Sequence, residues 1–411
     1  MIVTLQSVLY RSLFRVVRHR ISRKVIPHVC ERIGDPLKKR YVQFIVFIAV
    51  VVVIVLLSGF SFTSMWKDPP IVPGPGVTEI KMLSDWLPSL AGTKSDTEVY
   101  IIRGSQPGGN LLLLGGNHPN EPGGMLAAVL MIENVSSLAG TVYIIPRANH
   151  SAFTHNDPME GAPQFFSIEL PDGSKRTFRF GSRRTNPVSQ WPDPTIYNHP
   201  TGSTLGGSEI SNLNRAFPGR EDGLITERVA AAIMNIVKQE KIDLVCDLHE
   251  SSPEYPVNNA IVFHQKAAEL AIMTQMMLEM EGVNIRLEES PPSLRGLTHR
   301  EIGDNSDAYV VLLEVANPSQ GRLRGKTTEE LVTTGVDKYY LQASKDGKLF
   351  APYDETGYPL ELRVARHVTT VRVLLDSWNM MFPDRMIMLS DVPAYNAILS
   401  DGLGAFLKPV S

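Results

Sequence analysis

This chain of 411 residues contains very few cysteines, and one long stretch of it contains no charged residue. Only two cysteines occur, Cys30 and Cys246, and an apolar run lies between them. That run, Val42 to Phe62, has no charged residue over about the length that a helix needs to cross a bilayer. We therefore expect the cysteines to lie on opposite sides of a membrane and to form no disulfide.

Acidic residues are rare before the apolar run. Residues 1–40 contain ten Lys or Arg and only two acids, Glu31 and Asp35. Since basic flanks stay in the cytoplasm, the imbalance places the N-terminus inside and the large C-terminal part outside. The apolar run could instead be a buried core helix or a cleaved signal peptide. A core helix would show a polar face, and the apolar region of a signal peptide seldom has forty residues ahead of it. We expect an uncleaved single-pass anchor in contact with membrane lipid.

Aromatic residues are nearly absent from the basic block, which argues against a nucleic-acid partner. Residues 9–26 alternate apolar and basic side chains at helical spacing. This pattern fits a helix on an anionic membrane surface, and it fits a simple topology determinant equally well.

Residues 67–76, KDPPIVPGPG, cannot continue a helix and favour an extended, stiff spacer. We therefore predict a cytoplasmic segment over 1–41, a transmembrane helix over 42–62, a linker over 63–76 and a catalytic or binding domain over 77–411. The overall composition, 43% hydrophobic and 20% charged, is that of a globular protein.

Beyond residue 77, apolar strand-like runs alternate with helical patterns. This alternation predicts an α/β fold with a mixed, mostly parallel central sheet flanked by helices. Residues 151–213 are rich in Pro, Gly, Asn and Arg with little periodicity, so we interpret them as a functional insertion or lid. No internal repeat is visible.

Ionisable side chains follow three of the predicted strands. His118 and Glu121 follow one, His249 and Glu250 end another, and Glu314 ends a third. Ligands of such folds bind beyond the carboxyl ends of the strands. Taken alone, the first pair is also compatible with a helix N-cap arrangement or an ordinary loop.

Together with His249, the pair supplies two imidazoles and one carboxylate, the ligand set of a catalytic zinc site with one position open. Asp247 precedes His249 by two residues on the same strand face. It could orient a ligand, or it could be a buried carboxylate with a structural partner.

Four motifs, in order across residues 98–318, carry a resemblance to a known family. They are GGNHPNEPGG (115–124), NLNRAFPG (212–219), DLHES (247–251) and LLEVANP (312–318). The chain thereby resembles the zinc carboxypeptidases of the M14 type, and within them the succinylglutamate desuccinylase and aspartoacylase branch. Pro119 stands where that family usually has Gly.

The resemblance implies a Zn²⁺ ion held by His118, Glu121 and His249, with Glu314 as general base and then general acid. It also implies that Asn214 and Arg215 hold a substrate carboxylate. The family uses a further arginine to polarise the carbonyl, and here Arg147, Arg183 and Arg184 are all candidates. We favour Arg184 for this role and place Arg147 among the substrate-binding residues.

Two features of the family have no clear counterpart. Tyr255 and Tyr309 are candidates for a tyrosine that closes over the substrate, without a matching motif. The region after about Arg324 lacks the strand-rich pattern of the small β domain in the desuccinylase branch.

The sequence thus predicts a membrane-anchored zinc amide hydrolase whose substrate, a peptide or an N-acyl amino acid, carries a free carboxylate. A peptide is slightly favoured by the predicted outward location. The alternative is a catalytically silent membrane-tethered binding protein that keeps the fold.

Overall fold

The computed structural model describes residues 36–157 and 161–410, which form two compact units divided after Ser64. The first unit contains helix α3 (Pro36–Ser64). Its stretch Lys38–Ser64 is long and apolar enough to cross a membrane, and none of it is buried. The predicted span lies inside this helix, whereas the helix expected over residues 9–26 lies outside the described residues.

The second unit is built around a nine-stranded sheet. The strand order is β1 (Glu79–Met82), β2 (Glu98–Arg103), β4 (Ser136–Ile145), β3 (Gln106–Leu114), β9 (Leu244–Ser251), β12 (Tyr309–Ala316), β10 (Ala260–Phe263) and β11 (Arg286–Glu289). The short strand β13 (Met388–Ser390) pairs with β4. The central strands β4, β3, β9 and β12 are all parallel to one another, and antiparallel pairs join them to β2 and β10. The predicted mixed α/β sheet is confirmed.

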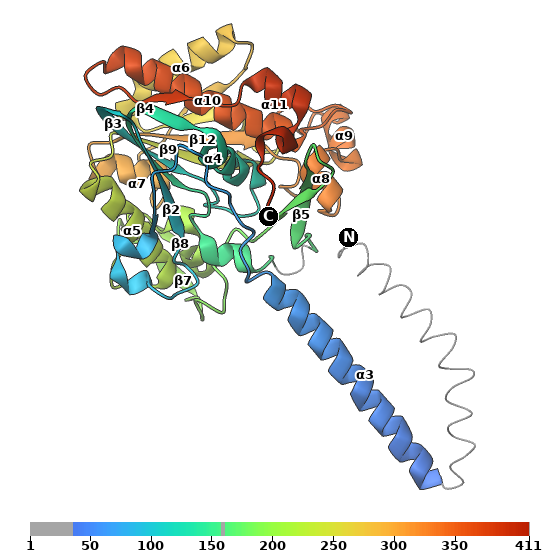
Figure 1. The fold of residues 1–411 in the computed structure, drawn as a ribbon. Coiled ribbons are helices and arrows are strands. Elements are labelled where there is room, and N and C mark those ends of the chain that lie inside the picture. The colour runs from blue at the N-terminus through green and yellow to red at the C-terminus, as the bar shows by residue number, and fades with distance from the viewer. Residues whose placement is uncertain (1–35, 158–160, 411) are drawn as a thin grey trace. The chain divides into compact units, whose positions relative to one another are not determined.

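Helices cover both faces of this sheet, and strand β3 shows why. Leu111 and Leu113 belong to one buried cluster, whereas Leu112 and Leu114 belong to the other. Since side chains alternate along a strand, a continuous leucine run supplies apolar surface to both faces. One face packs against α4 (Pro122–Asn134), α6 (Ala268–Met280), α10 (Leu360–Met381) and α11 (Tyr395–Asp401). The other packs against α5 (Ile225–Gln239) and α7 (Thr298–Asn305), as Figure 1 shows.

The stretch predicted as an insertion forms two small hairpins. One pairs β5 (Phe165–Glu169) with β6 (Lys175–Arg179), and the other pairs β7 (Ile196–Asn198) with β8 (Thr204–Gly206). After Arg324 the described chain is mainly helical, with α8 (Glu329–Thr334) and α9 (Lys338–Lys345) preceding α10 and α11. This region therefore forms no separate β domain within the described residues.

The segment that follows Met65 is packed against the rest of the second unit, to which it belongs. Asp68 forms ion pairs with His150 (2.8 Å), Arg179 (2.9 Å) and Arg147 (3.4 Å). Gly74 N also donates to Ile132 O at 3.0 Å. The segment forms no helix or strand, in agreement with its prolines, but it is not a free spacer, because cationic and polar partners from distant parts of the chain hold it in place.

Candidate metal centre and substrate site

Three neighbouring parallel strands bring the predicted site together. Strands β3, β9 and β12 are adjacent in the sheet and point the same way, so their carboxyl ends meet at one edge. His118 and Glu121 lie in the turn after β3, and His249 lies near the end of β9. Glu314 on β12 is in direct register with His249. Residues separated by up to 196 positions in the sequence (118 to 314) therefore share one site.

The side chains of His118, Glu121 and His249 converge on one point. One ligand atom from each lies within 4.8 Å of the others. Glu121 Oε1 is 2.9 Å from His118 Nδ1, and Glu121 Oε2 is 3.0 Å from His249 Nδ1. All three residues are at most 2% exposed, so water cannot solvate their charges. Buried carboxylates of this kind need a paired positive charge or a metal.

The other ring nitrogens show which atoms are available as ligands. His118 Nε2 lies 2.9 Å from Asn212 Oδ1, and His249 Nε2 lies 2.9 Å from Asp247 Oδ2. The Asn212 amide is oriented by two further bonds, since Oδ1 accepts from Asn214 N and Nδ2 donates to Glu209. Both contacted oxygens are acceptors, so each Nε2 carries the proton and donates.

A neutral imidazole with its proton on Nε2 has only a lone pair on Nδ1. Burial and the charge of Arg183 lower the pKa of His118 to about 4, so this ring is neutral near pH 7. Its Nδ1 lone pair then faces a carboxylate oxygen, an arrangement that a cation between them would stabilise. Two imidazole nitrogens and a carboxylate are donors that Zn²⁺ accepts, so the residues present fit this metal.

His249 differs from His118 in its electrostatics. Burial opposes its positive charge, but the Asp247 carboxylate and then Glu121 raise the pKa of His249 well above its usual range. The pKa of Glu121 is well below its usual range, because the two imidazoles outweigh the opposing effect of burial. In the absence of a metal, a proton on His249 can therefore neutralise part of the cluster.

The turn that carries the first two residues is fixed by close packing on β9. Glu250 N donates to Glu121 Oε2 at 3.0 Å, and Gly123 N donates to Glu250 Oε2 at 2.9 Å. A Cβ atom at Gly124 would lie 2.3 Å from Leu248 O, so no larger residue fits there without displacement. The glycines after the motif thus allow α4 to begin directly against the strand that supplies His249.

Glu314 lies beside the cluster without belonging to it. Its Oε2 atom is buried and has no hydrogen-bond partner among the described residues. Burial and the negative charge of Glu121 raise the pKa of Glu314 to about 8. A carboxyl group whose pKa is near neutrality can both accept and donate a proton.

The three candidate arginines have different partners. Arg183 Nη1 lies 3.2 Å from Glu121 Oε1, which places its guanidinium at the cluster. Arg184 pairs with Glu209 at 3.2 Å instead. Arg147 donates to Pro69 O and pairs with Glu98, both at 3.1 Å, in the network that holds the segment after Met65. The structure therefore supports Arg183 better than Arg184 as the arginine that polarises the carbonyl. Among the described residues, Arg147 contacts the segment after Met65 and not the candidate metal ligands.

Asn214 and Arg215 form a short turn after Asn212. Asn214 Oδ1 accepts from Thr298 N (2.9 Å) and Thr298 Oγ1 (3.0 Å), which fixes its amide. Arg215 Nη1 donates to Asn214 O at 2.6 Å, and its nearest carboxylate contact, to Glu209, is long at 3.9 Å. Burial and the charge of Arg183 lower the pKa of Arg215, as expected for a cation with incomplete compensation.

The two candidate tyrosines lie in different environments. Tyr255 is 51% exposed, and its hydroxyl contributes to the electrostatics of Arg215. Tyr309 instead stacks edge-on against Trp378 and Phe382 in the apolar layer. Only Tyr255 is therefore placed near the candidate substrate site. The sequence did not single out Asn212, Asn117 or Thr298, because an amide or hydroxyl near a site has no distinctive spacing.

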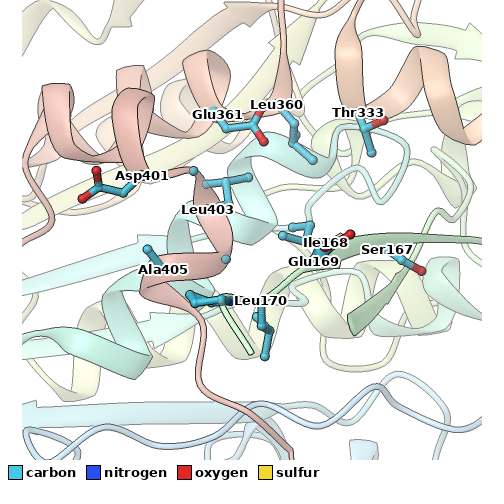
Figure 2. Close-up of a pocket in the computed structure, with 13 residues that line it drawn as sticks. Ser167, Ile168, Glu169, Leu170, Thr333, Leu360, Glu361, Asp401, Leu403 and Ala405 are labelled. Carbon is cyan, nitrogen blue, oxygen red and sulfur yellow. The ribbon is translucent and has the colours of Figure 1, made fainter. Parts of the chain in front are cut away.

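A cavity of about 440 Å³ lies away from this site, between β5, the start of α10 and the turn after α11 (Figure 2). Its lining includes Leu170, Leu360 and Leu403 together with the carboxylates Glu169, Glu361 and Asp401. None of the predicted site residues lines it. Acidic side chains on a surface cavity do not by themselves identify a ligand, so we do not include the cavity in the candidate site.

Comparison with known proteins identifies the family. Residues 107–333 match the model of the succinylglutamate desuccinylase/aspartoacylase catalytic domain. Among solved structures, apo cell shape determinant protein Csd4 from Helicobacter pylori is 16% identical, with a TM-score of 0.40 over 72% of this chain and 56% of that chain. A succinylglutamate desuccinylase from a Silicibacter species is 18% identical, with a TM-score of 0.34 over 60% of this chain and 63% of that one.

The ectoine utilization protein EutE (DoeB) from Ruegeria pomeroyi is 19% identical, with a TM-score of 0.32 over 53% of this chain and 52% of that chain. This chain thus spans between about half and two thirds of the length of these proteins. Comparison with curated proteins gives no match. Since the matched family model covers more than half of its residues, the chain belongs to the succinylglutamate desuccinylase/aspartoacylase family.

Proposed function

We propose that this protein is a zinc-dependent hydrolase that cleaves an amide bond in a substrate with a free carboxylate. Membership of the family supports amide hydrolysis of the desuccinylase/aspartoacylase type. The observation that carries the zinc requirement is the position of the Glu121 carboxylate between two imidazole Nδ1 atoms, at 2.9 and 3.0 Å. The Nε2 atoms of both rings already face acceptors, so the Nδ1 atoms point inward as ligands.

His118, Glu121 and His249 would hold the ion, with Asn212 and Asp247 fixing the two imidazoles. When bound at such a site, Zn²⁺ would lower the pKa of bound water from its bulk value to about 7 and polarise a carbonyl oxygen. Asp247 contributes a negative charge behind His249, which makes that imidazole a stronger donor. These outer contacts keep both rings in the required tautomer.

Glu314 is proposed to transfer the protons. Its Oε2 takes a proton from water as the oxygen attacks the carbonyl carbon, and then delivers that proton to the leaving nitrogen as the C–N bond breaks. Its raised pKa suits both steps, because a group that titrates near the working pH is available in either protonation state. Positive charge at the neighbouring cluster would lower this pKa and favour the form that accepts the proton.

Arg183, Asn214 and Arg215 are proposed to orient the substrate. The guanidinium of Arg183 contacts Glu121, so it lies where negative charge would develop on the carbonyl oxygen. Arg215 Nη1 donates to Asn214 O, but the only carboxylate contact of this side chain among the described residues is distant, so its Nε and Nη2 groups can form two parallel hydrogen bonds with a substrate carboxylate. Arg184, which the sequence favoured for the first role, would then support the loop through Glu209.

Helix α3 is proposed to anchor the protein as a single transmembrane span. Its apolar stretch has the necessary length, and the excess of basic residues before it favours a cytoplasmic N-terminus. The hydrolase unit would then face outward, where peptides are accessible amide substrates. Protease added to intact cells should digest or release this unit, whereas protection until the membrane is opened would reverse the orientation.

Metal analysis of the purified protein tests the central proposal. We expect about one zinc per chain in the wild type, and loss of the metal in His118→Ala and His249→Ala. Retention of metal in both variants would contradict the assignment of the ligands. A panel of peptides and N-acyl amino acids, each with its carboxylate free or amidated, then identifies the substrate class. A zinc-loaded protein that hydrolyses neither class would favour a silent binding protein.

A further inference from the structure

A continuous chain of hydrogen bonds runs from the proposed metal ligand His249 to Asn214. His249 Nε2 contacts Asp247 Oδ2 at 2.9 Å, and Asn117 Nδ2 donates to the same oxygen at 3.1 Å. Asn117 Nδ2 also donates to Thr298 Oγ1 at 3.0 Å, and Thr298 Oγ1 donates to Asn214 Oδ1 at 3.0 Å. Every residue that takes part in this series of hydrogen bonds is at most 4% exposed.

The direction of each bond is determined by the groups involved. The Asp247 carboxylate only accepts, so the atom of Asn117 that faces it is the amide nitrogen, which has two protons to donate. One proton goes to Asp247 and the other goes to the Thr298 hydroxyl. That hydroxyl therefore accepts from Asn117 and uses its single proton for Asn214, whose Oδ1 also accepts from the backbone N–H of Thr298.

We infer that Thr298 is a positioning residue that couples the orientation of the His249 imidazole to the position of the Asn214–Arg215 turn. This inference rests on the proposed function, because it takes His249 as a metal ligand and the turn as the carboxylate-binding element. A single hydroxyl at the start of α7 then fixes an orientation and a distance at once. It sets where the imidazole points and how far the carboxylate-binding turn lies from it.

The burial of the hydroxyl explains why another residue would not serve. Thr298 has no exposed surface, so water cannot replace its hydrogen bonds. Valine has nearly the same shape but would leave an Asn117 proton and part of the Asn214 oxygen without a partner, which is costly in a buried position. Asn117 would then be free to rotate, and Asp247 would lose the hydrogen bond that it accepts from Asn117.

The test measures Zn²⁺ binding alone, by competition with a chelator, in the full-length protein without any substrate. We expect Thr298→Val to weaken zinc binding about tenfold, at the lower end of the range of about 10- to 100-fold for outer partners of metal ligands. Thr298→Ser keeps the hydroxyl and should bind within about twofold of wild type. Thr274→Val is the matched control, because it removes a buried hydroxyl whose only hydrogen bond among the described residues is to Leu270 O within α6.

Asn214→Leu tests the far end of the same chain of bonds. It should weaken zinc binding in the wild-type background, although Asn214 does not contact the ligands, and should add little in the Thr298→Val background. If Thr298→Val fails to fold, Asn214→Leu still shows whether the Asn214 end of the hydrogen-bond series affects the affinity for zinc. Wild-type zinc affinity in Thr298→Val or in Asn214→Leu would overturn the inference. Absence of zinc binding in the wild type would instead overturn the proposed function.

Discussion

The guanidinium of Arg363 and the carboxylate of Glu250 form an ion pair 3.2 Å apart in which neither side chain is exposed. Arg363 lies on α10, and Glu250 directly follows the proposed ligand His249. Glu250 also accepts from Gly123 N and from Asn317 Nδ2 (3.1 Å). The pair therefore connects the C-terminal helix to the turn that carries Glu121, although α10 lies outside the part of the chain matched by the family.

Removal of Arg363 should destabilise the protein by about 3–5 kcal/mol, because an uncompensated buried carboxyl group remains. Burial raises the pKa of Glu250 to about 7 against the effect of Arg363, so the lone carboxyl group would take up a proton, and the loss should lie near the lower end of this range. Urea denaturation of Arg363→Met measures the loss. The double variant Arg363→Met, Glu250→Gln should recover part of it, and a wild-type stability in Arg363→Met would show that the pair contributes nothing net.

Glu314→Gln should retain zinc and folding but lose most turnover. The substitution keeps the shape of the side chain and removes its capacity to accept a proton. General acid and base catalysis contributes about 10²- to 10⁴-fold in rate, so kcat should fall by this factor. Metal content and circular dichroism serve as the controls for folding. Unchanged turnover would exclude Glu314 from proton transfer.

Arg183→Ala and Arg184→Ala form a matched pair, since the two side chains are adjacent and 40% and 42% exposed. Loss of Arg183 should lower kcat by about 10²- to 10³-fold, as for the removal of one donor to a developing oxyanion. Loss of Arg184 should have a much smaller effect, because its partner is Glu209. The reverse order would restore the preference for Arg184 that the sequence suggested.

The Asp68 ion pairs should stabilise the protein at neutral pH and not in acid. Burial opposes its charge, but the hydrogen bond from His150 and the charges of Arg147 and Arg179 lower the pKa of Asp68 below its usual value of 3.8. The folded state then binds the proton less readily than the unfolded state. The stabilisation is thus fully present above about pH 4 and is lost as the pH falls further.

Denaturation of wild type and Asp68→Asn at several pH values measures this difference. We expect roughly 1 kcal/mol near pH 7, a modest value because about two fifths of the Asp68 side chain is exposed, and a smaller difference at pH 3. Asp307→Asn, at an exposed carboxylate, is the control and should show no such dependence. A difference that grows in acid would contradict the sign of the shift.

Local sequence patterns predicted the sheet and the meeting of His118, Glu121 and His249, because strand ends and short motifs determine where these residues lie. The choice between Arg183 and Arg184 could not be made in this way. The two arginines are chemically identical neighbours in an irregular loop, and only the loop backbone decides which one reaches Glu121. The sequence could not identify Thr298 as a positioning residue either, since its partners Asn117 and Asn214 lie 181 and 84 positions away.

The binding of residues 65–76 to the hydrolase unit has a practical consequence for expression of that unit without α3. A truncated chain that begins at Val77 would lose Asp68 together with the carbonyl groups of Lys67, Pro69 and Pro70. Arg147, Arg176 and Arg179, all largely buried, would each lose a partner. A chain that begins at Met65 keeps these contacts, so we expect it to fold and stay soluble where the chain that begins at Val77 does not.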